Sequence, residues 1–506
     1  MTTEANNAPA SRVAERQRAE HTERDRWIAL YVLCAGFLMI VLDMTVVNVA
    51  LPAIQDDLGF SQSGLAWVVN GYLIAFGGLL LLSGRLGDLL GRKDVFMVGM
   101  AIFLAASLVC GFAQSQELLV GARFIQGIGG ALTSAVILGM IVTMFTEPKE
   151  QAKALGVYAF VASAGGSIGL LAGGVLTEAI NWHWIFFINI PIGIATAFAA
   201  NRLVVRDEGL GFDKGTDIPG AVLITSALML GVYTIVGPAA ESGWGDGTTL
   251  LLGGISIALL GAFILRQAKA ANPLMPLRMF ASRNVSGANL IQALLIAGMF
   301  GMFFLGSLYM QEVLGYDALE IGLAFLPTTL AMGIMSIRYS DRLINRFGPK
   351  NVLLPGLFLI GAGLALFTRT PVDGVYLEHV LPPMLLLGIG AGSSFTALMT
   401  LAMSGATQED AGLASGLVNT TAQVGAALGL AVLATLSATR TENLVADGES
   451  VPAALVSGYH LAFWIGAGLV AVAITVAAFV VESPDELPET ADADESRGGE
   501  PALSAS

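Results

Sequence analysis

Residues 64–93 read GLAWVVNGYLIAFGGLLLLSGRLGDLLGRK and contain the transition that decides the fold. The segment 64–83 has no charged side chain, whereas 84–93 holds Arg85, Asp88, Arg92 and Lys93. An α-helix needs about 20 apolar residues to cross a bilayer. A helix also satisfies its own backbone hydrogen bonds in lipid, which an open sheet cannot do. The stretch therefore predicts a membrane-spanning helix that ends in a basic surface loop.

The whole chain has the composition of a membrane protein. Hydrophobic residues make up 55% of its 506 residues and charged residues only 13%, about half the share in a soluble domain. Similar apolar runs recur along the chain. We expect fourteen membrane-spanning helices near 27–50, 64–83, 95–113, 117–144, 152–176, 184–204, 218–238, 248–267, 285–311, 318–337, 351–369, 376–401, 411–436 and 458–481.

The positions of Lys and Arg predict the orientation of these helices. Cytoplasmic loops are enriched in both residues. With the N-terminus inside, 22 of the 25 fall on the inner side, Arg369 and Arg440 fall outside, and Arg123 lies within a span. We therefore expect both termini in the cytoplasm. Six Lys against nineteen Arg, with abundant Ala and Gly, are typical of a GC-rich bacterial genome, so we expect a protein of the bacterial cytoplasmic membrane. No cleavable signal peptide is recognisable in the polar first 26 residues.

The order of spans and loops predicts five regions. The basic Ser340–Gly348 loop, which contains Asp341, occupies the same place in the second half as the Gly84–Lys93 loop does in the first. Six-plus-two-plus-six spans fit a transporter built from two related bundles. The regions are a cytoplasmic segment 1–26, a six-helix bundle 27–204, an inserted helix pair with linkers 205–270, a second six-helix bundle 271–481, and a disordered acidic cytoplasmic tail 482–506.

Two charged residues within the spans are candidates for proton coupling. Asp43 lies deep in the first span, where a charge costs roughly 3 kcal/mol on insertion scales. Arg123 shares one helical face with Gln126, Gly127 and Ser134, and that face should point into the bundle. Asp43 can exchange a proton while Arg123 biases it. A helix-packing hydrogen bond for Asp43 and a structural charge pair for Arg123 are the alternative interpretations.

Other residues predict close helix packing or contact with a substrate. Gly165, Gly169 and Gly173 are spaced four apart, which lets another helix approach closely and could seal one side of a pathway. Polar side chains within spans are candidates for a substrate cavity, although each could equally bond a neighbouring helix: Asn70, Gln126, Gln292, Asn419 and Gln423.

The sequence gives no sign of an enzyme, cofactor or metal site. The histidines and the two cysteines are scattered, and no Gly-x-x-x-x-Gly-Lys-[Ser/Thr] motif for binding nucleotide occurs. We expect neither a nucleic acid nor a nucleotide as a partner. Because no nucleotide would supply energy, transport would be driven by an ion gradient or be passive. The expected partners are a small-molecule substrate, protons and membrane lipid.

Taken together, these stretches resemble the major facilitator superfamily. Gly84, Asp88, Gly91 and Arg92 match its cytoplasmic loop signature, and Arg123–Gly130 resembles its fourth-helix motif. Three features resemble the fourteen-helix drug:proton antiporter branch of this superfamily. They are Leu42–Pro52, Trp182–Gly193, and a glycine motif that comprises Gly156, Gly165, Gly169 and Gly173.

The resemblance implies a substrate cavity between two six-helix bundles, alternating access by their rocking, and exchange of protons for hydrophobic or cationic drugs. Asp43 and Arg123 would couple the proton, and Asp88 and Arg92 would stabilise one conformation. Two transport hypotheses stay open: a multidrug or antibiotic exporter, and a dedicated exporter of one endogenous metabolite such as a self-made antibiotic, siderophore or amino acid. A membrane enzyme or receptor is disfavoured by the missing catalytic clusters and sensor domain.

Overall fold

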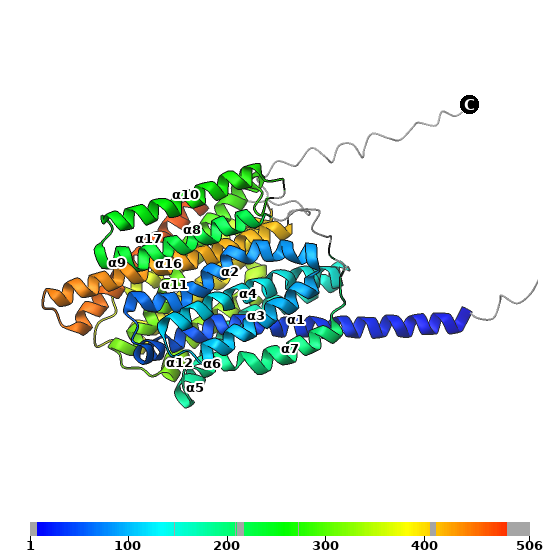
Figure 1. Ribbon diagram of the computed structural model, residues 1–506, viewed down its shortest axis with the longest axis horizontal. Helices are drawn as coiled ribbons and strands as arrows, with labels where there is room; N and C mark the ends of the chain where they lie inside the picture. The colour runs from blue at the N-terminus through cyan, green and yellow to red at the C-terminus, as the bar shows by residue number, and fades with distance from the viewer. Residues whose placement is uncertain are drawn as a thin grey trace, which may run out of the picture.

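A computed structural model describes residues 8–145, 147–207, 209, 217–271, 273–404 and 411–482. Within these ranges every regular element is a helix. The long helices run side by side in one bundle, and α1 continues beyond it as a single extended rod (Figure 1). The expectation of an all-helical protein is confirmed for the described part of the chain.

The first group of helices surrounds α1. Helix α1 packs on α5 and α7, while α2 and α3 pack on α4. Local sequence sets their ends: Ser61 and Ser115 accept backbone hydrogen bonds at the starts of α2 and α4, as N-cap residues do. Gly91 joins α2 to α3 with φ +99°, a conformation that favours glycine. The bounds are α1 Ala8–Leu58, α2 Gln62–Leu90, α3 Arg92–Gly111, α4 Gln116–Met144, α5 Pro148–Ala179, α6 Trp184–Phe187 and α7 Asn189–Leu203.

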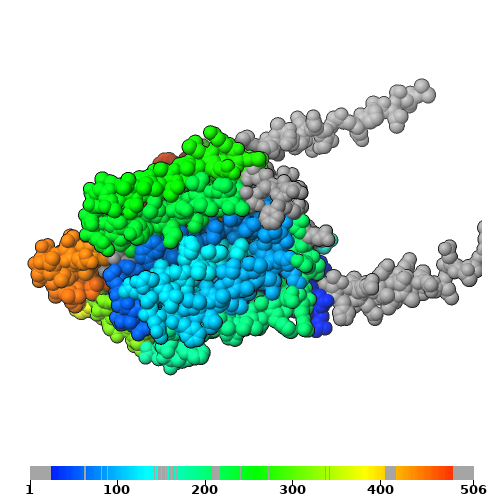
Figure 2. Space-filling view, viewed as in Figure 1, coloured from blue at the N-terminus to red at the C-terminus, as the bar shows by residue number. Residues whose placement is uncertain are grey.

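A helical pair lies between the first and last groups in the sequence. It comprises α8 (Ile218–Val236) and α10 (Gly247–Lys269), with the short α9 (Pro238–Ser242) between them. Asp217 and Asp246 cap the starts of α8 and α10. The pair packs on itself, and α8 also packs on α2 and α16. It forms a layer along one side of the first group (Figure 2).

The last group contains the remaining long helices. Helix α11 packs on α16 and α17, and α14 packs on α15 and α17. Three π-helical turns, η3, η4 and η5, continue or precede α11, α12 and α15. The bounds are η2 Leu277–Ala281, α11 Arg283–Leu308, η3 Tyr309–Val313, α12 Ala318–Ile334, η4 Met335–Ser340, α13 Asp341–Phe347, α14 Pro349–Phe367, η5 Tyr376–Val380, α15 Leu381–Ser404, α16 Ala411–Ala446 and α17 Val451–Phe479.

Twelve helical segments of the described chain are long and apolar enough to cross a membrane. Helices α2 and α5 contain the shorter apolar stretches Gly64–Leu80 and Ile168–Ala179. The expected count of fourteen is therefore reached only if α2 and α5 also span. Length and composition of the described residues establish a multi-pass helical protein with twelve candidate spans.

The first and last groups meet along two glycine-containing interfaces. Gly174 of α5 and Gly322 of α12 each lie against the opposite helix so closely that a β-carbon would come within 2.8 Å of a main-chain carbonyl oxygen across the interface. Gly77 of α2 faces Gln423 of α16, where an added β-carbon would lie 2.7 Å from the Gln423 β-carbon. Small residues allow such helices to approach backbone to backbone.

Candidate functional site: a buried ion pair and an apolar cavity

Asp43 lies at the centre of a buried polar cluster. Its side chain has no exposed surface, and its carboxylate accepts three hydrogen bonds from two other helices. Arg123 Nη1 lies 2.5 Å from Oδ2, while Gln126 Nε2 lies 2.7 Å and Asn189 Nδ2 2.8 Å from Oδ1. The pair Asp43–Arg123 is a salt bridge shielded from solvent. A buried pair of this kind is stable only while both charges keep their partners.

Arg123 is held in place by further contacts. Its Nε donates to the Val68 carbonyl oxygen at 3.0 Å, and its Nη1 also donates to Gln126 Oε1 at 2.7 Å. The guanidinium carbon lies 4.4 Å from the ring centre of Tyr72 and 5.7 Å from that of Phe186. Aromatic faces stabilise a desolvated cation. These contacts orient Arg123 toward Asp43.

Two members of the cluster were not predicted from the sequence. Ser107 Oγ accepts from Gln126 Nε2 at 2.8 Å and from Asn189 Nδ2 at 3.4 Å. Asn189 lies within the Trp182–Gly193 stretch that supported the family resemblance, so its position in that motif was an available signal. Ser107 is an ordinary serine in an apolar helix, and nothing in the sequence singles it out.

The predicted substrate residues do not gather at one place. Gln126 belongs to the Asp43 cluster, with its amide oxygen and nitrogen bonded to protein groups. Asn70 is fully buried in α2, and both its amide atoms lack a hydrogen-bond partner within the described chain. Gln292 is buried in α11, Gln423 is half-buried against Gly77, and Asn419 is exposed on α16.

The predicted loop signature holds helix ends together within the first group. Arg92 Nη1 donates to the Gly139 carbonyl oxygen of α4 at 3.2 Å, and Lys93 Nζ donates to the Asn201 and Val204 carbonyl oxygens near the end of α7 at 2.8 and 2.7 Å. Gly84 has open space around it, and Gly91 forms the positive-φ joint described above. Among the predicted gating residues, Gly156 lies within helix α5, Asp88 within α2 and Asp341 at the start of α13, while the surroundings of these three residues lie outside what the structure describes.

The α5 glycines pack against the helix that carries Asp43. A β-carbon at Gly165 would lie 2.9 Å from Val41 Cγ1, one at Gly169 would overlap Thr45, and one at Gly173 would lie 2.8 Å from the Val46 carbonyl oxygen. Their close approach therefore positions α1 inside the first group. The neighbouring Gly174 lies against Ala318 of α12.

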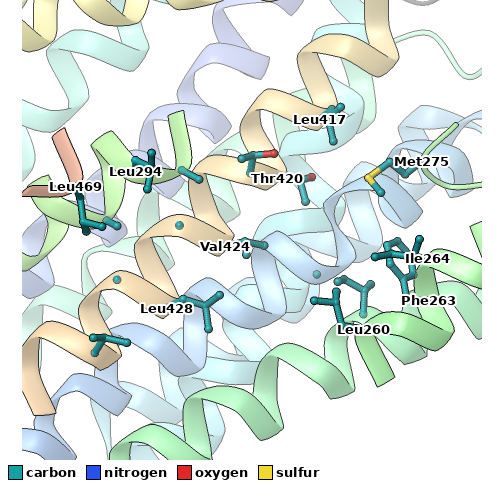
Figure 3. Close-up of a pocket in the computed structure, with 18 of the residues that line it drawn as sticks. Leu260, Phe263, Ile264, Met275, Leu294, Leu417, Thr420, Val424, Leu428 and Leu469 are labelled. Atoms are coloured by element: carbon teal, nitrogen blue, oxygen red, sulfur yellow. The ribbon is translucent and has the colours of Figure 1, made fainter. Parts of the chain in front are cut away.

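A separate apolar cavity of about 500 Å³ lies where the helical pair meets the last group. Leu260, Phe263 and Ile264 of α10 lie on one side of it, and Val424 and Leu428 of α16 on the other (Figure 3). Thr420 and Thr421 are the polar side chains among its described lining residues. The cavity suits a hydrophobic group and contains no charge.

The described residues hold no group of three or more His, Cys, Asp or Glu side chains that could bind a metal ion. The fold and the cluster define a multi-pass helical membrane protein with a completely buried Asp–Arg pair inside its first group of helices. Its sequence matches the profile of the Major Facilitator Superfamily over residues 33–430, so the chain belongs to this superfamily of transporters.

Curated relatives agree along nearly the whole chain. It is 39% identical to the puromycin resistance protein pur8 of Streptomyces alboniger over 467 residues, which cover 91% of this chain and 92% of the relative. It is 37% identical to the cephamycin export protein CmcT of Amycolatopsis lactamdurans, covering 88% and 91%. It is 36% identical to the lincomycin resistance protein of Streptomyces lincolnensis, covering 94% and 95%.

Solved structures confirm the fold. A bacterial homologue of the human lysosomal transporter Spinster, inward-facing and unoccupied, superposes with a TM-score of 0.64 at 15% identity, covering 90% of this chain and 96% of the other. The human organic anion transporter MFSD10 gives 0.60 at 15% identity, covering 89% and 99%.

Proposed function

We propose that this protein is a proton-coupled antiporter that exports antibiotics or other small hydrophobic or cationic compounds from a bacterial cell. The observation that carries the proposal is the Asp43–Arg123 pair, which is enclosed in the bundle and depends on the charge of one carboxylate. The names of the three relatives above refer to antibiotic resistance or export, which supports the substrate class.

The pair explains how a proton could drive conformational change. Ionised Asp43 accepts hydrogen bonds from Arg123, Gln126 and Asn189. Protonation removes the charge, weakens all three bonds and leaves Arg123 as an uncompensated buried cation, which costs several kcal/mol. The helices α1, α4 and α7 must then rearrange, or Arg123 must find another anionic or polar partner. The proton therefore favours one of two conformations.

The proposed topology has fourteen spans, with α2 and α5 crossing the membrane in addition to the twelve candidate segments. The groups before and after the α8–α10 pair act as two rocking bundles, and the pair is an insertion. The protein lies in the bacterial cytoplasmic (inner) membrane, with both termini and the Gly84–Lys93 loop in the cytoplasm. Lipid surrounds the bundle, and the apolar cavity accommodates a hydrophobic part of the substrate.

A resistance panel tests the proposal. The wild-type protein, Asp43→Asn and the control Asp246→Asn are expressed in cells that lack efflux pumps and exposed to puromycin, lincomycin, a β-lactam and ethidium. We expect resistance from the wild type and the control, and none from Asp43→Asn. Asp246 is a suitable control because it caps α10 in a loop, a role that Asn fills equally well. Equal resistance with and without Asp43 would refute proton coupling at this residue.

The same panel addresses the second candidate, a dedicated exporter of one compound. The names of these relatives each refer to a single antibiotic, which favours this alternative over broad specificity. Resistance to one compound only would support it, and resistance across unrelated compounds would support multidrug export.

A further inference from the structure

Two buried hydroxyl groups in the first group of helices lack hydrogen-bond partners, one beside Arg123 and one about three turns from it along α4. The Tyr72 hydroxyl and Ser134 Oγ are both buried and have none within the described chain. Buried polar atoms are nearly always satisfied by protein or by ordered water. Each hydroxyl can both donate and accept a hydrogen bond. The natural partners for this pair are therefore water molecules held inside the first group of helices.

The two hydroxyls lie along the helix that carries Arg123. The Tyr72 ring covers the Arg123 guanidinium at 4.4 Å, and its hydroxyl reaches Gly130, where a β-carbon would lie 2.7 Å from the oxygen. Gly130 is about two turns further along α4 than Arg123, and Ser134 follows one turn later on the same face. Because Gly130 has no side chain, the Tyr72 hydroxyl can approach the α4 backbone at this point.

Ser134 differs from the other buried helical hydroxyls nearby. Ser83, Ser107 and Thr133 each donate to the carbonyl oxygen four residues earlier, at 2.7 to 2.8 Å. Helical Ser and Thr commonly make this bond. The orphaned Ser134 Oγ makes no such bond to Gly130, which leaves its hydrogen and its lone pairs available to water.

The line continues toward the Gly84–Lys93 loop. Beyond Ser134 on α4, the Gly139 carbonyl oxygen and the Thr143 hydroxyl both accept hydrogen bonds from Arg92 Nη1, at 3.2 and 3.5 Å. Thr143 Oγ1 donates a hydrogen bond to the Gly139 carbonyl oxygen at 3.0 Å, and this bond is exposed. Polar atoms of α4 are therefore present at Ser134, Gly139 and Thr143, between the buried interior and the surface at one end of the helix.

We propose that Tyr72 and Ser134, with intervening water, form a proton path between the Asp43–Arg123 pair and the side of the membrane that carries the Gly84–Lys93 loop. This inference rests on the proposed proton coupling. The Asp43 carboxyl releases its proton to a neighbouring water, and each group along the path accepts a proton on oxygen while it passes on the hydrogen that it held. Neither hydroxyl gains a net charge. The products are the Asp43 carboxylate, paired with Arg123, and a proton in the water beyond Ser134.

A pH jump on the purified, full-length protein in lipid nanodiscs tests the path without a substrate. Infrared absorption follows the protonated carboxyl band that Asp43→Asn removes. Tyr72→Phe keeps the ring over Arg123, and Ser134→Ala removes only the hydroxyl. We expect each variant to slow the appearance and loss of the band by about tenfold or more, with a larger slowing in D₂O. The pH at which half the band is present should stay unchanged, because a path alters rate and not equilibrium.

Two variants serve as matched controls. Tyr459→Phe removes another buried tyrosine hydroxyl that lacks a partner, in α17, and Ser83→Ala removes a buried hydroxyl bonded to the Leu79 carbonyl oxygen. Both should titrate at the wild-type rate. Wild-type rates in Tyr72→Phe and Ser134→Ala, or a shifted midpoint with no slowing, would overturn the path while leaving proton coupling intact. A wild-type spectrum with no band that depends on Asp43 would instead refute the proposed coupling itself.

Discussion

Two buried carboxylates in this protein have nearly the same partners and very different surroundings. Asp43 is bonded by Arg123, Gln126 and Asn189. Asp217, at the start of α8, is bonded by Arg266 Nε at 2.9 Å, Gln267 Nε2 at 2.7 Å and the Gly220 backbone nitrogen at 3.0 Å. Each carboxylate thus combines an arginine, a glutamine and a third nitrogen donor.

Solvent access separates the two sites. The side chain of Arg123 is 1% exposed and that of Arg266 is 46% exposed. Water can stabilise Arg266 when its partner is lost, whereas Arg123 has only protein groups to compensate its charge. The same set of donors therefore makes a helix cap at the edge of the α8–α10 pair and a fully buried charge pair, the proposed switch, inside the first group.

The largest expected difference between the two sites is in proton-coupled transport when each acid is neutralised in turn. Asp43→Asn should reduce proton-coupled transport by about a hundredfold or more, since Asn cannot exchange a proton. Asp217→Asn should leave coupling intact. Drug-induced proton movement in everted membrane vesicles measures both. If Asp217→Asn abolished coupling, or Asp43→Asn retained it, the contrast between the two sites would fail.

Removing one donor from Asp43 should shift the pH dependence of transport. Asn189→Leu deletes a hydrogen bond to the ionised carboxylate, worth about 1.5–3 kcal/mol. Since the ionised form loses stabilisation, the pH of half-maximal transport should rise relative to the wild type.

A buried asparagine in the last group provides the control for this shift. Asn289 donates to the Val285 carbonyl oxygen and accepts from Thr421. Asn289→Leu is expected to lower thermal stability and to leave the pH midpoint in place. A common midpoint for wild type and Asn189→Leu would show that Asn189 does not act on the charge of Asp43.

A steric change beside Asp43 should have a smaller effect. Gly169→Ala places a methyl group against Thr45 of α1, and overpacking of this kind costs about 1–3 kcal/mol. Gly166→Ala adds the same methyl group in the same helix, where nothing lies within 4 Å. Thermal unfolding in detergent should show a lower midpoint for Gly169→Ala alone. Equal midpoints for the two variants would contradict the close α1–α5 contact.

The smallest effect is expected at the Asp217 cap. Burial raises the pKa of Asp217, but hydrogen bonds from Arg266, Gln267 and Gly220 outweigh burial and hold the pKa below its ordinary value. Because the pKa is depressed in the folded state, the contribution to stability is present at neutral pH and is lost as the pH falls below about 4. Asp217→Asn should cost about 1 kcal/mol at pH 7 and less at pH 3, as measured by thermal unfolding at both pH values.

The sequence allowed much of the site to be predicted because charge is conspicuous in an apolar run. Asp43 and Arg123 stand out for this reason, and helical spacing placed Gln126 on the same face as Arg123. The hydrogen-bond partners of these side chains were harder to predict. Asn189 lies 146 residues from Asp43 along the chain, and Ser107 resembles any other serine in a helix.

The fold was predictable at the level of class, and the details followed packing that a single sequence does not reveal. Apolar runs and loop motifs correctly indicated a helical transporter. The spacing of Gly165, Gly169 and Gly173 indicated a close helix contact, but only the structure identifies α1 as the helix contacted. Asn70, Gln292, Asn419 and Gln423 are all polar residues of spans, yet their burial ranges from complete to exposed, because polarity alone does not determine which way a helix faces.

The three bonds to Asp43 have a mechanical meaning. The carboxylate belongs to α1, two of its donors belong to α4 and the third to α7. Under the proposed coupling, a single proton on Asp43 would weaken bonds shared by three helices in one event. Their movements would then be synchronised, so that the three helices would need no separate signals to leave one arrangement for the next.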